Sequence, residues 1–189
     1  MTLRRVGLFG GTFDPPHFGH VAAVRAAVRT HRFNQIEVAV AGDPYQKVAR
    51  GYVRPAAVRL AMARAAFGEL EHVVVSDREV RRSGPSYTVD SVRELLATVD
   101  EVDLIIGADL VPDLEGWHES DQLRAMVRVG VVPRPDSLFE LPAGWVGYEI
   151  PMDPVDLSSS FVRSLTPDRV DLDIYIPTAV IPLFQATSG

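Results

Sequence analysis

The chain of 189 residues is long enough to bury one sizeable hydrophobic core, and its 47% hydrophobic and 23% charged residues exclude a largely disordered protein. Its formal net charge of −6 gives no general attraction for nucleic acids or anionic membranes, so we expect a local basic cluster to hold any phosphate ligand. The sequence has no cysteine, which excludes disulfides and thiolate metal sites. No apolar run is long enough for a secretion signal or a membrane span. We therefore expect a cytoplasmic protein with neither nucleic acid nor membrane as a partner.

Short apolar runs alternate with segments of helical periodicity along the whole chain. In chain order, we expect strands at 6–9, 36–40, 72–75, 102–106, 127–132 and 146–150, with helices at 20–31, 55–67 and 87–99. Pro55 suits a first helical turn, Gly68 suits a helix stop, and Ser86 is a candidate N-cap. The stretches 77–85 and 133–144 are expected to be loops.

Strands that alternate with helices in this way require right-handed crossovers and a mostly parallel sheet. We therefore predict an α/β fold, a Rossmann-like doubly wound sheet with helices on both faces. The pattern favours a single domain over 1–189, with a helical C-terminal portion from about 158. In such sheets ligands bind at the carboxyl ends of the strands, so the loops of interest are 10–19, 41–54, 77–86, 107–117 and 151–160.

The loop after the first strand reads Gly10-Gly11-Thr12-Phe13-Asp14-Pro15-Pro16-His17-Phe18-Gly19-His20. Glycines after a strand let the backbone approach a ligand, and the following helix offers unpaired N–H groups. His17 and His20 share one helix face, and Gly19 leaves the approach to them open. The spacing fits neither a P-loop nor a dinucleotide fingerprint, and a plain Gly/Pro-rich turn is a poor explanation for the full string. The loop is predicted to hold phosphate.

This string resembles the GxFDPxHxGH element of nicotinate-mononucleotide adenylyltransferases, members of the HxGH nucleotidyltransferase superfamily. Four further elements resemble that family in the same order along the chain: Pro44 to Lys47, Gly84 to Thr88 with Asp90, Gly107 to Asp109 with Trp117, and Leu157 to Arg163. The resemblance implies the transfer of an adenylyl group from ATP to a pyridine mononucleotide. It also implies nucleotide-associated Mg²⁺, and it leaves open contacts between copies of the chain as a homo-oligomer.

The resemblance implies three sets of site residues. The catalytic residues are His17, His20, Lys47 and Arg163; the ATP-binding residues are Gly10, Gly11, Thr12, Phe13, Gly19, Gly107, Asp109, Ser158, Ser159 and Ser160; and the mononucleotide-binding residues are Asp14, Lys47, Arg59, Tyr87, Thr88 and Trp117. No protein-held metal is expected, because no carboxylate cluster is visible in the sequence.

Several of these residues also have a physical reason for their role. Lys47 is the only lysine among eighteen arginines, and a compact ammonium suits a migrating phosphate charge. Ser158 to Ser160 can cap a short helix, with Arg163 one turn later. Asp109 either binds ribose hydroxyls or caps the next helix, and Trp117 either stacks on a pyridine ring or packs in the core. Arg59 is expected on the outer face of its helix.

The expected chemistry is positioning and charge stabilisation, as in other phosphoryl transfers. Two alternatives stay open from the sequence. One is a related HxGH enzyme that acts on another phosphate or phosphonate acceptor, and the other is a nucleotide-binding regulator without turnover. The choice between the acid and the amide mononucleotide also stays open.

Overall fold

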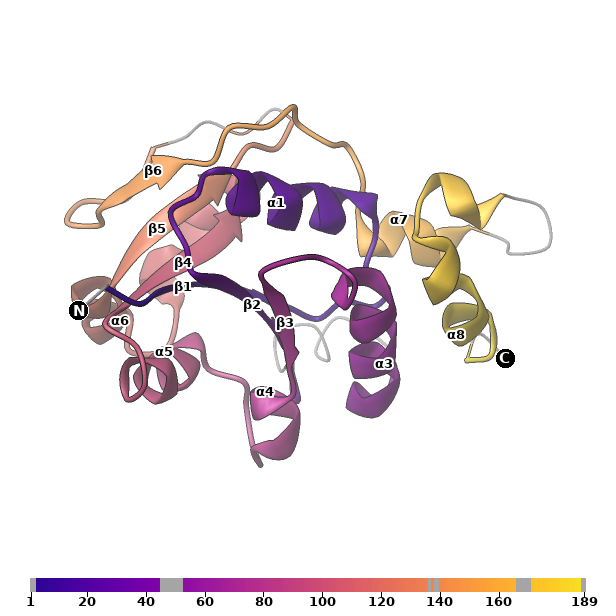
Figure 1. Ribbon diagram of the computed structural model, residues 1–189, viewed down its shortest axis with the longest axis horizontal. Helices are drawn as coiled ribbons and strands as arrows, with labels where there is room; N and C mark the ends of the chain where they lie inside the picture. The colour runs from indigo at the N-terminus through magenta and orange to yellow at the C-terminus, as the bar shows by residue number, and fades with distance from the viewer. Residues whose placement is uncertain (1–2, 45–52, 136, 138–139, 166–170, 188–189) are drawn as a thin grey trace.

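The computed structural model describes residues 3–44, 53–135, 137, 140–165 and 171–187 (Figure 1). Its centre is a six-stranded sheet in the order β3-β2-β1-β4-β5-β6, and every neighbouring pair is parallel. The strands are β1 (Arg5–Gly11), β2 (Gln35–Val40), β3 (Val73–Ser76), β4 (Glu101–Gly107), β5 (Val127–Val132) and β6 (Gly147–Glu149). The predicted α/β fold with a doubly wound parallel sheet is confirmed.

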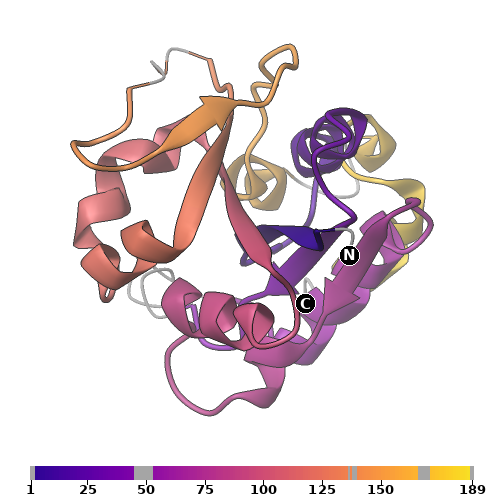
Figure 2. The ribbon, with the colours of Figure 1, turned by 60° about the vertical axis from the view of Figure 1, so that its left-hand side comes forward.

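Helices cover both faces of this sheet, and Figure 2 shows α1 and α5 on opposite sides of it. The α-helices are α1 (Phe18–Arg29), α3 (Ala56–Phe67), α4 (Arg78–Arg81), α5 (Thr88–Leu96), α6 (Ser120–Met126), α7 (Ser159–Ser164) and α8 (Ile181–Gln185). Three 3₁₀ helices are η1 (Ala108–Gly116), η2 (Leu172–Ile174) and η3 (Thr178–Val180). None of the helices in the described ranges is long and apolar enough to cross a membrane.

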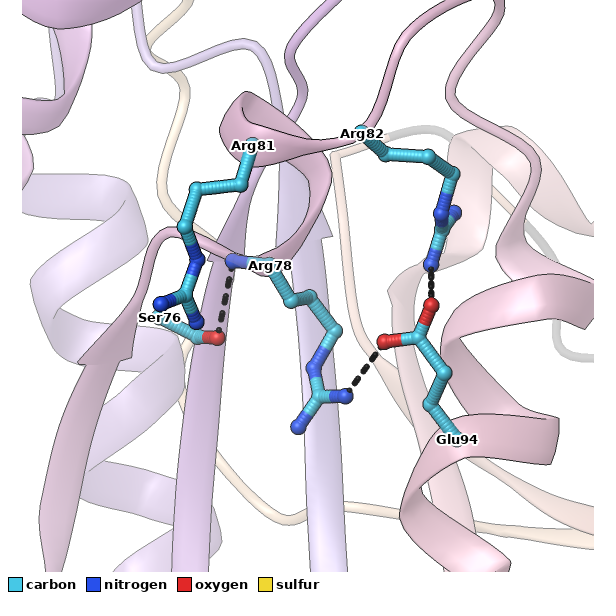
Figure 3. A pocket seen from close by; sticks show the side chains of 5 residues that line it. All are labelled: Ser76, Arg78, Arg81, Arg82 and Glu94. Carbon is cyan, nitrogen blue, oxygen red and sulfur yellow. Dashed lines mark hydrogen bonds and ion pairs between the residues drawn. The ribbon is translucent and has the colours of Figure 1, made fainter.

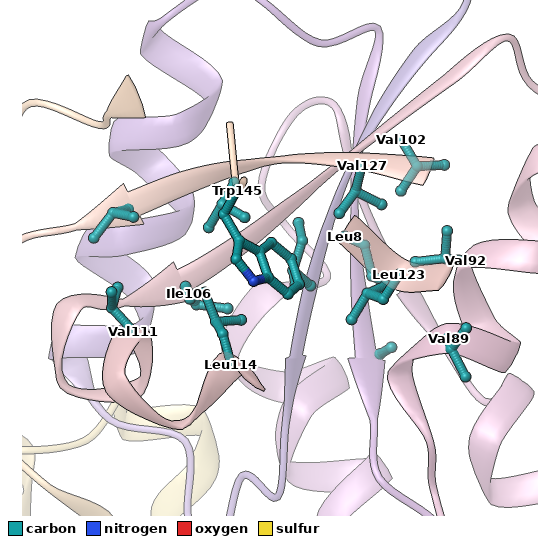
Figure 4. Close-up of a cluster of buried hydrophobic side chains, with 14 of the residues drawn as sticks. Leu8, Val89, Val92, Val102, Ile106, Val111, Leu114, Leu123, Val127 and Trp145 are labelled. Carbon is teal, nitrogen blue, oxygen red and sulfur yellow. The ribbon is translucent and has the colours of Figure 1, made fainter. Parts of the chain in front are cut away.

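The alternation of side chains along the central strands divides the core in two. Leu8 and Leu104 point to the face covered by α5, α6 and η1, where Trp145 also packs (Figure 4). Phe9 and Ile105 point to the other face, against α1 and α3. Both faces are buried, which explains why these strands read as continuous apolar runs. A third cluster joins α3 to α7, η2, η3 and α8, and Figure 1 shows α8 beside α3.

Some predicted boundaries and elements were wrong. The first helix begins at Phe18, two residues before its predicted start, so His17 is its N-cap residue. The stretch 77–85 contains α4, and no helix bounds were predicted for η1 or α6. Ser86 does not cap α5; Tyr87 takes that position, and the Ser86 hydroxyl accepts hydrogen bonds from the N–H groups of Gly42 and Asp43.

The order in which strands are added to the sheet reverses between β1 and β4, while all six strands stay parallel. The first three strands extend the sheet to one side, and the last three extend it to the other. The loops after β1 and β4 therefore diverge at the carboxyl edge, which is where doubly wound folds form their ligand crevice. The Gly10-to-His20 loop lies at this switch point.

Candidate active site

The two motif histidines lie face to face at the start of α1. Their ring centroids are 3.7 Å apart and their planes differ by 26°. The backbone N–H of His17 donates to Nδ1 of His20 at 3.2 Å, so a neutral His20 carries its proton on Nε2. Nδ1 of His17 is buried and finds no hydrogen-bond partner in the part of the chain that the structure describes. The two histidines that the sequence placed on one helix face thus stack on each other.

Both imidazoles are held in the uncharged form. Burial, helped by the charge of Arg134, lowers the pKa of His17 to about 3. Burial also lowers the pKa of His20 well below its usual value, and His17 and Arg134 act in the same direction. At neutral pH the pair therefore offers hydrogen-bond donors without bringing a positive charge of its own.

Gly19 is needed because the chain passes close to the His17 ring. A Cβ atom at this position would lie 3.1 Å from both Cε1 and Nδ1 of that imidazole. Such a contact is tighter than a normal van der Waals approach, so a side chain here would push the ring. Gly19 thus preserves the stacked geometry.

The charge of Arg134 acts on both histidines, and the sequence did not predict a role for this residue. It follows the end of β5, and its guanidinium lies 3.4 Å from a carboxylate oxygen of Asp109. It also donates to the carbonyls of Val155 and Leu157 at 3.0–3.2 Å. Arg134 lies just after the carboxyl end of a parallel strand, and this position could have marked it as a candidate site residue. The stretch 133–144 was instead predicted to be a surface loop.

Asp109 lies in the first turn of η1 and does not cap that helix. Gly107 occupies the N-cap position of η1, and no side chain bonds there. The capping alternative is therefore wrong, and the half-exposed Asp109 carboxylate instead faces Arg134.

Helix α7 is attached to the first loop although about 145 residues separate them. The Ser158 hydroxyl accepts from the N–H of Phe161 at 3.1 Å, which is the predicted N-cap. Ser159 donates to the carbonyl of Pro15 at 2.9 Å. Arg163 donates to the carbonyl of Asp14 at 2.6 Å and to the Ser160 hydroxyl at 3.1 Å. The structure thus brings the closing motif beside the opening one.

Asp14 is buried in an ion pair within the protein. Its carboxylate accepts from the backbone N–H of Arg54 at 3.2 Å and from the guanidinium of Arg54 at 3.0 Å. The same guanidinium donates to the Thr187 hydroxyl at 2.8 Å and lies over the ring of Phe184. The Asp14 carboxylate therefore holds the loop rather than facing a crevice.

The predicted position of Arg59 on an outer helix face is wrong. Its side chain is among the largest fully buried ones, with 1% of the residue exposed. Helix α3 turns this arginine toward the loops after β1 and β2, where backbone carbonyls accept its hydrogen bonds. The apolar pattern of the helix could not reveal this, because a buried cation is normally excluded from such a face.

The residues expected around a pyridine ring lie near the start of α5 and the end of η1. Tyr87 stacks on His118 with centroids 3.9 Å apart, and Thr88 is the first residue of α5. Trp117 is partly buried and packs against the cluster beneath α5 and α6. Its packing favours the core alternative for much of its surface, and stacking on a ligand stays a prediction. Lys47 lies outside the described residues.

A separate pocket beyond β3 is lined by Ser76, Arg78, Arg81, Arg82 and Glu94 (Figure 3). Arg78 pairs with Glu37 and Glu94, and Arg82 also pairs with Glu94. Carboxylates thus already offset these cations, and none of the predicted site residues lines the pocket. Within the described ranges, no three histidine or acidic side chains come together as a metal site.

A doubly wound parallel sheet with an HxGH histidine pair at its switch point defines a class of proteins, the nucleotidyltransferases. A model of the cytidylyltransferase-like family matches residues 8–172, and the chain belongs to this family. Curated relatives are more specific. The chain is 33% identical to the probable nicotinate-nucleotide adenylyltransferase of Gemmatimonas aurantiaca, across 97% of this chain and 90% of the relative. It is 34% identical to the protein of the same name from Thermomicrobium roseum, across 99% and 78%. The resemblance that the motifs indicate is confirmed.

Solved structures agree on the fold. The nicotinic acid mononucleotide adenylyltransferase of Plasmodium falciparum superposes with a TM-score of 0.77 at 18% identity, covering 97% of this chain and 95% of that one. A putative nicotinate-nucleotide adenylyltransferase from Vibrio parahaemolyticus gives a TM-score of 0.67 at 16% identity, with 97% and 99% covered.

Proposed function

We propose that this protein transfers the adenylyl group of ATP to nicotinate mononucleotide, giving nicotinate adenine dinucleotide and pyrophosphate. The observation that carries the proposal is the stacked, uncharged histidine pair at the switch point, in a chain with full-length relatives of that name. The Plasmodium protein of the same fold was solved with APC, an ATP analogue, and with NaAD.

The reaction needs no covalent intermediate on the protein. A phosphate oxygen of the mononucleotide attacks the α-phosphorus of ATP, and the bond from that phosphorus to the bridging oxygen of the β-phosphate breaks. The electron pair leaves with pyrophosphate, so negative charge moves toward the β- and γ-phosphates. The protein contributes by aligning the two phosphates and by stabilising the charge that moves.

His20 is the main donor to the reacting phosphate in this proposal. Its Nδ1 accepts the backbone N–H of His17, so Nε2–H is available to an α- or β-phosphate oxygen. His17 stacks beneath it and supplies a second donor. The ATP chain would run along Gly10 to Phe13 and Gly19, with Gly107 and Asp109 toward the ribose and Ser158 to Ser160 toward the terminal phosphates.

Cations at the crevice steady the leaving group. Arg163 lies beside the first loop, and Arg134 acts on both histidines, so both can face pyrophosphate. Lys47 is assigned to the same charge on the strength of its motif alone. Mg²⁺ would be held mainly by nucleotide oxygens and water and would neutralise phosphate charge.

We place the mononucleotide, the acceptor of the adenylyl group, at the start of α5. The first N–H groups of a helix lack intrahelical partners, and those of Thr88 and Val89 suit the pyridine carboxylate. Trp117 and the Tyr87 ring would bound the pyridine. Asp14 and Arg59, which the motifs assign to the mononucleotide, have their charged groups bonded to protein atoms, so we assign them to loop placement.

An acceptor panel tests this function. Purified protein with ATP and Mg²⁺ would be offered nicotinate mononucleotide, nicotinamide mononucleotide and unrelated phosphates, and pyrophosphate release would be followed. We expect the acid mononucleotide to give the highest kcat/KM. A different best acceptor would favour the related-enzyme alternative, and no release with any of them would favour the inactive regulator.

A further inference from the structure

Arg59 is a buried cation whose guanidinium bonds to backbone carbonyls. With 1% of the residue exposed, its guanidinium donates to the carbonyls of Arg54 at 2.8 Å, Thr12 at 3.0 Å, Ala41 at 2.6 Å and Gly42 at 3.0 Å. Burial lowers its pKa, while the charges of Asp14 and Asp43 oppose that shift. The cation is therefore stabilised by carbonyl dipoles together with nearby acids.

These four carbonyls come from three stretches of chain. Thr12 belongs to the loop that carries His17 and His20, and Ala41 and Gly42 follow β2. Arg54 comes two residues before α3 begins. Ala41 and Gly42 on one side, and Arg54 on the other, bracket the stretch 43–53, which contains Lys47. A single guanidinium thus ties both ends of that stretch to the histidine loop.

The backbone after β2 is also fixed from its other side. The N–H of Ala41 donates to the carbonyl of Gly11, and the N–H of Gly42 donates to the Ser86 hydroxyl. A Cβ atom at position 42 would lie 2.1 Å from the carbonyl oxygen of Glu79, so only glycine fits there. The carbonyls of Ala41 and Gly42 accept hydrogen bonds from Arg59, so the guanidinium is part of a fixed contact between this turn and α3.

We propose that Arg59 is a positioning residue that fixes the histidine loop to the turn after β2 and to the residue that precedes α3, without touching substrate. The proposal rests on the proposed function, because that function sets the histidine loop against the triphosphate. An arginine is required, since its planar fork presents five N–H donors to carbonyls spread around it. A lysine has three donors on one atom and cannot reach all four.

The test compares Arg59→Lys with Arg64→Lys. Arg64 lies on the same helix, but 57% of its side chain is exposed. Hydrogen exchange would be measured without substrates on the peptide covering 10–20 and at the hydrogen-bonded N–H groups of Ala41, Gly42 and Arg54. Values of kcat and KM would be measured with both substrates. For Arg59→Lys we expect exchange about tenfold faster at both places and kcat lower by about ten- to a hundredfold. Arg64→Lys should behave as the unsubstituted protein.

Loss of activity with unchanged exchange would show that Arg59 acts on substrate directly and would overturn the proposal. So would unchanged activity, or an acceleration of exchange that extends equally to β4 and β5. If Arg59→Lys does not fold, Arg59→Gln gives the same readouts with a shorter, neutral side chain. A wild-type protein without turnover would refute the proposed function, and the exchange comparison would still decide whether Arg59 holds the two stretches.

Discussion

Arginines gather in two regions of this molecule and do different work in each. Around the first loop, Arg59 and Arg163 donate to backbone carbonyls, while Arg54 pairs with the carboxylate of Asp14. Between α4 and α5, Arg78 and Arg82 donate to carboxylates, with Glu94 shared between them (Figure 3). A cation bonded to carbonyls fixes the path of the backbone and keeps its positive charge, whereas one paired with carboxylates is neutralised. Only the first region is equipped to shape a phosphate site.

The largest effect is expected from breaking the buried ion pair of the first region. Asp14→Ala deprives the buried Arg54 guanidinium of its carboxylate, and breaking such a pair costs about 3–5 kcal/mol. Chemical denaturation should show this loss. Asp14→Asn keeps the shape and one acceptor, so it should lose less. Equal stability of the alanine variant and the unsubstituted protein would mean that the Asp14–Arg54 ion pair does not stabilise the fold.

Removal of the His20 imidazole should reduce catalysis strongly and leave the fold intact. His20→Ala loses the donor assigned to the moving charge, and such a loss costs about 10²- to 10³-fold in kcat. Initial rates of pyrophosphate release measure it, and circular dichroism checks folding. Arg25→Ala, an exposed change on the same helix, is the control. A His20→Ala variant with ordinary turnover would remove His20 from the mechanism.

The uncharged histidines also predict how stability depends on pH. The folded-state pKa of His17 is about 3, below the unfolded value of 6.5, so the unfolded chain binds the proton more readily. The free energy of unfolding should therefore fall as pH drops from 6.5 toward 3, by up to about 1.4 kcal/mol per pH unit for this group. Thermal unfolding at pH 7, 6 and 5 tests this, and His17→Asn should flatten the slope. A slope unchanged by that substitution would contradict the assignment.

The smallest effect is expected in the second region. Glu94 is about half exposed, so Glu94→Gln weakens pairs that solvent already screens. The change in stability should stay below about 1 kcal/mol, with kcat unaltered. Denaturation and initial rates are the measurements. A marked loss of activity would show that the α4–α5 network also shapes the site, and the contrast between the two regions would fail.

The sequence predicted the sheet well because buried parallel strands read as apolar runs between glycines and prolines. It missed the short elements: α4 is four charged or β-branched residues, and η1 contains Pro112. In the site, local motifs identified the histidines and α7. The burial of Arg59 escaped prediction because its hydrogen-bond partners are backbone carbonyls, which every residue possesses and no side-chain pattern marks. Arg134 escaped because its carboxylate partner, Asp109, and its carbonyl partners are distant in sequence.

The contact between Arg54 and Thr187 joins positions 133 residues apart. During synthesis from the N-terminus, the strands of the sheet and the histidine loop emerge long before Thr187 and Phe184 do. The nascent chain can thus assemble its central sheet while the surroundings of Arg54, and through it Asp14, are still incomplete. The C-terminal residues, which are synthesised last, thus complete the surroundings of Asp14 in the first loop, which is synthesised early.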